Sequence, residues 1–286
     1  MKKGGKINMK DSLGDRMKGF YEDRYRIYLT RRMPVIIRID GNAFHTFTRG
    51  LDRPFDLDFM NIMQDTCYSL CRNIQGCVGG YVQSDEISLL LVDYNTITTD
   101  AWFDYNLQKI TSIAAARATM TFNGLVRDLV AKYEAEGYAC SQIEGEEERE
   151  AVCFAKANLW RPKIDRAMFD ARAFNIPKEE VCNYFIWRQQ DATRNSIQSA
   201  GQAVFSHKEL NGKTCSDIQE MLFQKGINWN NYFTDQKRGA FAYKAKRILV
   251  NSFAENEEIF EWVIDADMPI LTEDRDYIDG LVFVGE

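Results

Sequence analysis

The apolar and polar positions of the first hundred residues predict three elements in a fixed order. They are a buried strand at Val35–Ile39, an amphipathic helix over 58–74 and a hairpin of strands 76–83 and 86–93. In the helical stretch, apolar residues recur every three or four positions, whereas the strands are short apolar runs rich in β-branched residues. Asp40-Gly41 ends the first strand, and Ser84-Asp85 forms the turn of the hairpin. The chain therefore begins with strand, helix and hairpin.

The rest of the chain predicts more helices and one further strand. These are a helix over Trp102–Lys132, a strand over 168–177, a long helix from Lys178 to Phe205, and short helices and strands from Ser206 onward. In the long helix, bulky apolar residues give way to small polar ones, which indicates that its later turns face a site. We expect an N-terminal tail (1–20), one catalytic domain (21–205) and a C-terminal extension for RNA or subunit contacts (206–286).

Composition limits the class of protein. A chain of 286 residues with 45% hydrophobic content can bury one sizeable core. No apolar run reaches the roughly 20 residues of a membrane span, and the N-terminal segment lacks a signal peptide's apolar stretch, so we expect a cytoplasmic protein. The seven cysteines lack CxxC spacing, so they favour reduced packing residues over disulfides or a zinc ribbon. Cys67 and Cys71 share a helix face and are also read as packing residues rather than metal ligands.

The net charge of −6 is unevenly distributed. Residues 134–150 hold seven glutamates against one arginine and predict an exposed acidic insertion. Without this stretch the chain is close to neutral, and basic clusters at 23–34 and 235–247 remain available to phosphates. The acidic balance therefore does not exclude a nucleic-acid substrate.

Candidate chemistry lies at the ends of the first strand and the hairpin. An ionised carboxylate beside a buried strand is costly unless a partner compensates it. If the two strands lie side by side, Asp40 and Asp85 meet at one edge of the sheet, where paired carboxylates share a proton or hold a divalent ion. Oxygen ligands with few histidines favour magnesium, and two such ions serve in-line nucleotidyl transfer. Taken singly, each aspartate is also a common turn residue, and carboxylate pairs also cleave sugars.

Five segments resemble, in order, the motifs of the tRNA-histidine guanylyltransferase family. They are RIDGNAFHTF (38–47), YVQSDEISLLL (81–91), FDARAFNIP (169–177), YFIWRQQDATRNSI (184–197) and KGINWNNYFTDQKRGAF (225–241). The resemblance implies an α/β (α+β) fold, a polymerase-palm-like, ferredoxin-type antiparallel sheet with helices packed on it, plus the C-terminal extension. It also implies two Mg²⁺ ions and 3′-to-5′ polymerisation. ATP or GTP first activates the RNA 5′ end, and the 3′-hydroxyl of an incoming nucleoside triphosphate then attacks it.

The resemblance also implies roles for individual residues. The catalytic acids are Asp40, Asp85 and Glu86, and the metal ligands are Asp40, Asp85 and the carbonyl of Gly41. The nucleotide-binding residues are Asp40, Gly41, Asn42, Ala43, Phe44, His45, Ser84, Asp85 and Asn195. Basic residues at phosphate-binding positions are Arg38, Arg53, Lys109 and Arg172. Each basic residue, and His45 in its loop, would otherwise read as an ordinary surface residue.

The long helix departs from the histidine-specific members. They carry a HINN-type motif where this chain has Thr193-Arg194-Asn195-Ser196, a form that resembles bacterial, archaeal and phage-type like-proteins. These resemble template-dependent enzymes that repair the 5′ end of truncated tRNA, so we expect that activity, in a homo-tetramer. Val82 stands where glycine is common, which leaves both aspartates in place. Two alternatives stay open: a dedicated tRNA-histidine guanylyltransferase, and an RNA-independent nucleotide cyclase. A non-enzymatic RNA-binding protein would not need both aspartates.

Overall fold

The structure, a computed structural model, describes residues 12–250 and 256–282. The strands are β1 (Val35–Gly41), β2 (Cys77–Gln83), β3 (Glu86–Leu91), β4 (Phe169–Asn175), β5 (Ala240–Val250) and β6 (Asn256–Asp265). The helices are α1 (Ser12–Met17), α2 (Phe44–Phe47), α3 (Leu57–Asn73), α4 (Leu107–Cys140), α5 (Glu147–Trp160), α6 (Lys178–Val204), α7 (His207–Leu210), α8 (Cys215–Gln224), α9 (Thr234–Arg238) and α10 (Asp276–Asp279). Single turns of 3-10 helix or π-helix lie between several of these elements.

The strands form one antiparallel sheet in the order β4-β1-β3-β2-β5-β6. Strands β1 to β4 and the helices α3 and α4 follow one another in the chain as strand, helix, strand, strand, helix, strand. Strand β1 lies between β3 and β4 in the sheet. This is the ferredoxin-type arrangement that the sequence predicts, and the prediction of a palm-like antiparallel sheet with packed helices is confirmed. The strand, helix and hairpin expected from the first hundred residues are β1, α3 and β2–β3.

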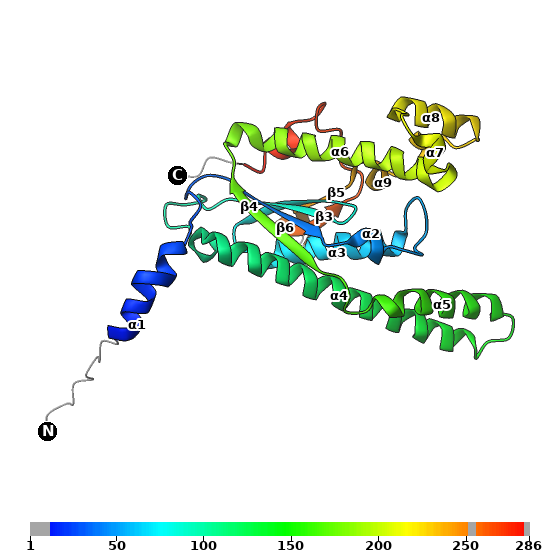
Figure 1. The fold of residues 1–286 in the computed structure, drawn as a ribbon, viewed down its shortest axis with the longest axis horizontal. Helices are drawn as coiled ribbons and strands as arrows, with labels where there is room; N and C mark the ends of the chain where they lie inside the picture. Colours follow the sequence, from blue (N-terminus) through cyan, green and yellow to red (C-terminus); the bar gives the residue numbers. More distant parts are fainter. Residues whose placement is uncertain (1–11, 251–255, 283–286) are drawn as a thin grey trace, which may run out of the picture.

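Helices cover both faces of the sheet (Figure 1). On one face Ile37 and Leu89 pack into a core shared with α3 and α4, and on the other Ile36 and Leu90 pack against α6. Because successive side chains of a strand point to opposite faces, a strand buried on both faces is a continuous apolar run. The same alternation directs Arg38, two residues after Ile36, to the α6 face.

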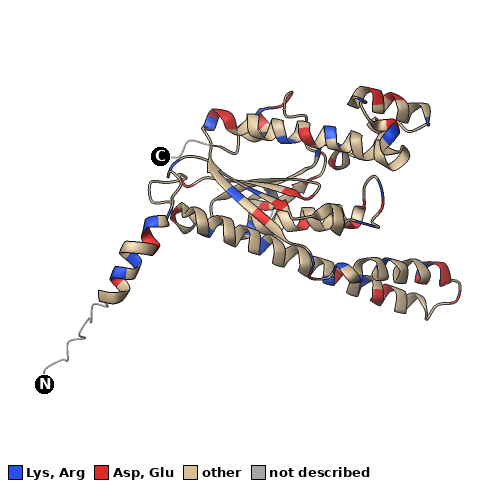
Figure 2. Cartoon of the chain, viewed as in Figure 1, with Lys and Arg blue, Asp and Glu red and all other residues tan. Residues whose placement is uncertain are grey.

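Helices α4 and α5 form a hairpin that projects beyond the sheet (Figure 1). The stretch 134–150 comprises the end of α4, a turn and the start of α5, and acidic residues mark its tip (Figure 2). Helix α4 therefore extends beyond the helix expected over Trp102–Lys132, and α5 is an element that the sequence pattern does not predict. Glutamate is a good helix former, and Cys153, Ala157 and Trp160 bury one side of α5 against the body, so the acidic composition does not interrupt the helices.

The C-terminal segment is only partly separate from the sheet. Strands β5 and β6, from the expected extension 206–286, continue the sheet beyond β2. Residues 206–238, which we call the C-terminal lobe, pack on the end of α6 around a small core of Ile197, Ala200, Ile218 and Leu222. The extension's expected contacts with RNA or other subunits stay a prediction. Residues 1–11 of the expected N-terminal tail lie outside the described residues. The chain is helical from Ser12.

The cysteines are all unpaired thiols, as expected, and six of the seven are buried. Cys67 and Cys71 of α3 lie against the backbone of β2 at Gly80. Within the described ranges, no helix is long and apolar enough to cross a membrane.

Replacing Gly80 with alanine will lower the free energy of unfolding by about 1–3 kcal/mol. A β-carbon there would lie 2.5 Å from Cys71 Sγ and 2.9 Å from Cys67 Sγ, so the packed helix must shift. Urea denaturation measures the change. The matched control is Gly124→Ala in α4, where a β-carbon meets no atom within 4 Å and alanine favours the helix by about 0.5–1 kcal/mol. Equal effects at the two sites would contradict the packing argument.

Candidate active site

The two aspartates singled out in the sequence lie together at one edge of the sheet. Strand β1 pairs with β3 so that Asp40 is opposite Glu86, and the Gly41 N–H donates to the Asp85 carbonyl oxygen over 3.0 Å. Ser84 adopts a positive φ of 48°, which turns the chain tightly between β2 and β3. The hairpin turn therefore delivers Asp85 beside the end of β1, as the strand pattern predicts.

Asp85 is costly to keep ionised in this position. Burial raises the pKa of its carboxyl group, and the negative charge of Asp40 raises it further. The Asp85 backbone N–H and the Ser84 hydroxyl, whose Oγ lies 3.1 Å from Oδ1, oppose this by stabilising the carboxylate. Binding a cation would relieve both the burial cost and the repulsion between the two aspartates.

Gly41 and Phe44 shape the backbone next to Asp40. A β-carbon at position 41 would lie 2.4 Å from the Phe44 ring, so only glycine allows this approach. The ring itself is buried and packs against Phe47 and Phe169, with centroids 5.0 Å away in each case. The Phe44 ring therefore belongs to the core, and at this residue it is the backbone rather than the side chain that faces the site. Exposed positions nearby are Asn42, Ala43 and His45.

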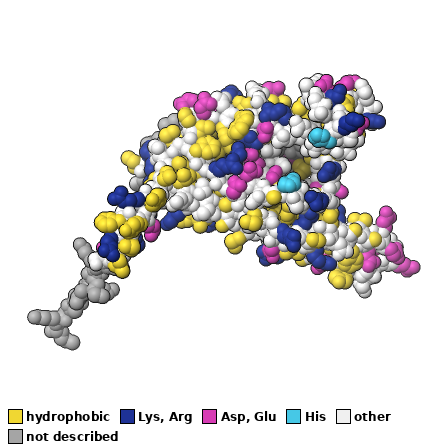
Figure 3. All heavy atoms as spheres, in the orientation of Figure 1, with side chains coloured by type: hydrophobic (Ala, Val, Ile, Leu, Met, Phe, Trp, Pro, Cys, Tyr) yellow, Lys and Arg dark blue, Asp and Glu magenta, His cyan; other side chains and the backbone are white. Residues whose placement is uncertain are grey.

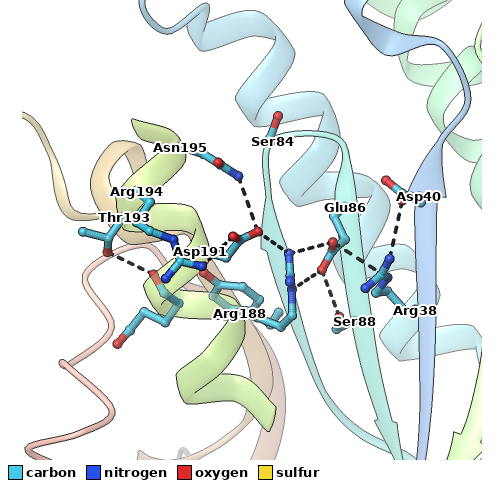
Figure 4. Close-up of polar contacts among 12 residues, drawn as sticks. Arg38, Asp40, Ser84, Glu86, Ser88, Arg188, Asp191, Thr193, Arg194 and Asn195 are labelled. Carbon is cyan, nitrogen blue, oxygen red and sulfur yellow. Dashed lines mark hydrogen bonds and ion pairs between the residues drawn. The ribbon is translucent and has the colours of Figure 1, made fainter. Parts of the chain in front are cut away.

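Glu86 faces α6 and forms a buried ion pair (Figure 4). Arg188 donates from Nε to Oε1 over 2.7 Å and from Nη2 to Oε2 over 2.9 Å, and the two side chains are only 5% and 8% exposed. Arg188 also donates to Asp191 over 2.8 Å, and Asp191 accepts from Arg194 over 2.8 Å. Glu86 is thus next to the aspartates in sequence but is tied to the helix.

Two arginines flank the Asp40 carboxylate. Arg38 Nη2 lies 3.8 Å and Arg172 Nη2 lies 4.0 Å from Asp40 Oδ2. Arg38 Nε is also 3.8 Å from Glu86 Oε2, yet it makes no hydrogen bond within the described part of the chain. Both basic residues predicted at this sheet edge therefore lie beside the acids, where they add positive charge.

A cavity of about 250 Å³ opens next to the hairpin turn, and its wall includes Ser84, the neighbour of Asp85 in the chain, but neither Asp40 nor Asp85. Its wall includes Arg53 from the segment before α3, Ser84 at the hairpin turn, and Asn195 from α6. Ser196 and Ser199 line it too, so the later turns of α6 do face a hollow, as their small polar residues predict. The surface is visibly hollowed next to the end that carries α7 and α8 (Figure 3). Three predicted nucleotide-binding residues are therefore brought together here by tertiary structure.

Lys109 lies apart from this group. It is in the first turn of α4, with its ammonium group 5.7 Å from the centre of the Phe103 ring. Further along α4, the Thr119 hydroxyl accepts from the N–H of Phe169 over 3.1 Å, and Phe169 is opposite Gly41 in the β1–β4 register. Ten helical residues separate Lys109 from Thr119, which is about 15 Å. Lys109 therefore lies apart from the aspartates within the described chain, and its expected contact with a phosphate stays a prediction.

Several residues at the site were not predicted. Arg188 and Asp191 lie in the motif segment 184–197, and their charges after the apolar run Tyr184–Trp187 are the available signal. Lys237 in α9 lines the cavity, and so does Gln83 at the end of β2. Nothing in the local pattern of residues 234–239 indicates that they meet α6.

The residues present fit a magnesium ion. Asp40 and Asp85 supply hard oxygen donors at adjacent strand ends, and the backbone of Gly41 is held close to both. Among the residues described, no three or more His, Cys, Asp or Glu side chains form a group that could hold a metal ion. Mg²⁺ is commonly bound through one or two carboxylates, with substrate phosphates and water completing its shell. A pair of aspartates beside a cavity meets this description.

Comparison with known proteins assigns the family. The family model for tRNAHis guanylyltransferase matches residues 14–177, which is more than half of the chain and includes both aspartates. The chain belongs to the tRNAHis guanylyltransferase family. As a member of this family it is a nucleotidyltransferase, and the resemblance found in the sequence is confirmed.

Solved structures and curated relatives agree with this assignment. A bacterial tRNA(His) guanylyltransferase-like protein in complex with ATP has a TM-score of 0.76 and 41% identity, covering 96% of this chain and 100% of its own. A bacterial like-protein in complex with GTP has a TM-score of 0.73 and 38% identity, with the same coverage. A probable tRNA(His) guanylyltransferase of Dictyostelium discoideum is 25% identical over 230 residues, 76% of this chain and 77% of its own length.

Proposed function

We propose that this member of the tRNAHis guanylyltransferase family adds nucleotides in the 3′-to-5′ direction to the 5′ end of tRNA, in a magnesium-dependent reaction. The observation that carries the proposal is the pairing of Asp40 and Asp85 at adjacent strand ends, next to a cavity whose wall includes Ser84, the neighbour of Asp85 in the chain. In such a reaction a nucleoside triphosphate first activates the 5′-phosphate. The 3′-hydroxyl of the incoming nucleotide then displaces the activating group.

Asp40, Asp85 and the carbonyl of Gly41 are the residues that would hold the magnesium ions. The bound ions would activate the attacking oxygen and neutralise charge on the leaving phosphate. Arg38 and Arg172 lie within 4.0 Å of Asp40 and would place positive charge beside the phosphates of the substrate. Glu86 would act mainly by holding β3 against α6 through Arg188.

ATP and GTP or other nucleoside triphosphates are the proposed small substrates. The bacterial like-proteins with 41% and 38% identity bind ATP and GTP, which supports a nucleotide in the corresponding cavity here. Arg53, Ser84 and Asn195 would contact it from three sides, and exposed His45 lies in α2, five residues after Asp40 near the end of β1. The backbone of 41–44, rather than the Phe44 ring, would complete the contacts.

Template-dependent repair is the form of the reaction that we favour. Thr193-Arg194-Asn195-Ser196 replaces the motif of the histidine-specific members, and Asn195 and Ser196 line the cavity. A pocket that accepts several nucleotides must leave the choice of base to pairing with the RNA. A cytoplasmic homo-tetramer remains our prediction for the location and the assembly.

The decisive experiment is extension of a 5′-truncated, 5′-monophosphorylated tRNA with Mg²⁺, ATP and all four nucleoside triphosphates. We expect addition at the 5′ end of the nucleotide complementary to the opposite base, and a switch of the added nucleotide when that base is changed. Primer-extension sequencing identifies it. Guanosine added whatever the opposite base would indicate a dedicated guanylyltransferase, and nucleotide consumption without RNA would indicate a cyclase-like reaction.

A further inference from the structure

A second hollow lies on the C-terminal lobe, outside the site described above. It has a volume of about 330 Å³ and is lined by Gln219, Glu220, Phe223, Asn228, Trp229 and Asn230. We call it the α8 hollow. The small core formed by α6 and α8 supports it, and Trp229 packs partly buried against that core. The hollow is therefore a preformed feature of the lobe.

Its lining combines an exposed aromatic ring with unpaired amides. Phe223 is 64% exposed on α8, although its neighbour Leu222 is fully buried in the lobe's core. The side-chain amides of Gln219 and Asn230 make no hydrogen bond within the described ranges. Aromatic faces stack on unpaired nucleobases, and amides read their hydrogen-bonding edges. The carboxylate of Glu220 disfavours a phosphate in the hollow, so the chemistry fits a base rather than the RNA backbone.

The α8 hollow adjoins the cavity next to the hairpin turn, because residues that line the hollow are in direct contact with residues that line the cavity. Trp229 Nε1 donates to Ser196 Oγ over 3.0 Å, and Ser196 lines that cavity. Lys237 also lines it, while its ammonium donates to the Asn230 carbonyl over 2.8 Å and lies 5.7 Å from the centre of the Trp229 ring. An RNA end in the cavity thus has the hollow as an immediate neighbour.

Templated addition at a 5′ end requires unpaired bases on the opposite strand, and these bases form a 3′ overhang. We propose that the α8 hollow binds an unpaired base of this 3′ overhang, with Phe223 as the stacking platform and the amides of Gln219 and Asn230 at the base edge. This inference rests on the proposed function for the identity of the RNA. It adds a site that holds the template strand while the 5′ end is at the aspartates.

Binding of hairpin RNAs tests the inference without turnover. Fluorescence anisotropy of a loop-labelled RNA with a short 3′ overhang is compared with its blunt counterpart, in the absence of nucleotide. We expect the intact protein to prefer the overhang. Phe223→Ala should weaken overhang binding about tenfold and leave blunt binding unchanged, because stacking contributes on this scale. Phe223→Trp should retain the preference, since it keeps a stacking surface.

The matched control is Phe260→Ala on β6, where the ring is 67% exposed on a different surface. It should bind both RNAs as the intact protein does. An intact protein with no preference for the overhang would overturn the inference, and so would Phe223→Ala that weakens both RNAs equally or neither. The extension assay tests the proposed function separately. If 5′ addition is absent but the preference for the overhang is intact, the proposed function is contradicted and the α8 hollow is still supported as an RNA site.

Discussion

Replacing Asp85 with asparagine will lower the rate of nucleotidyl transfer by about 10³-fold or more while the fold is retained. A metal ion that polarises phosphoryl oxygens supplies several kcal/mol of transition-state stabilisation, and each 1.36 kcal/mol corresponds to tenfold in rate. Asparagine keeps the size of the side chain but removes the charge that attracts Mg²⁺. The rate is measured with the truncated tRNA at saturating nucleotide, alongside urea denaturation.

The unfolding measurement separates a lost ligand from a damaged fold. Burial and Asp40 both raise the pKa of Asp85, so its ionised form opposes folding, and the asparagine variant should be at least as stable as the intact protein. The matched control is Asp170→Asn. Asp170 is opposite Asp40 in the β1–β4 register but is 59% exposed and interacts with Arg172. We expect its rate to remain near that of the intact protein. Equal losses in both variants would contradict a specific metal role for Asp85.

Replacing Arg188 with alanine will destabilise the protein by about 3–5 kcal/mol. The change removes the two hydrogen bonds that Arg188 donates to the buried Glu86 carboxylate and leaves it only the longer contacts with Arg38 and Ser88, and breaking a buried ion pair in this way costs this much. Domains of ordinary stability have a free energy of unfolding of about 5–15 kcal/mol, so the variant should be close to unfolding at 37 °C. Urea denaturation at neutral pH gives the free energy of unfolding.

Two further variants test the explanation. Arg194→Ala removes an arginine that also pairs with Asp191 but is 51% exposed. It should lower the free energy of unfolding by less than about 1 kcal/mol. The double variant Glu86→Gln, Arg188→Met removes both charges and should recover much of the lost stability. If it also retains nucleotidyl transfer, Glu86 serves to anchor β3 to α6. A stable but inactive double variant would instead support the predicted catalytic role of Glu86.

Local pattern was sufficient for most of the secondary structure. The continuous apolar run of β1, the three-to-four spacing in α3 and the two-residue turn between β2 and β3 are each encoded within a few neighbouring residues. Helix α5 was missed because its glutamate-rich start reads as a solvated loop, and its buried side is defined only by contacts with α4 and the body. The sequence does not show that the Phe44 ring is buried, because an aromatic residue next to a functional motif can face either the ligand or the core.

The sequence by itself determined the order of strands and helices, the family, and the two aspartates at the ends of strands that had to be buried. The elements and the two aspartates follow from side-chain periodicity and from the cost of a carboxylate beside an apolar run, whereas the family follows from the five motif segments that resemble it. Tertiary structure alone decided that Glu86 pairs with Arg188, 102 positions away, that Lys109 lies apart from the aspartates, and that Lys237 reaches α6. The physical reason is that such contacts depend on how the sheet and helices pack, and residues distant in sequence carry no local signal of their meeting.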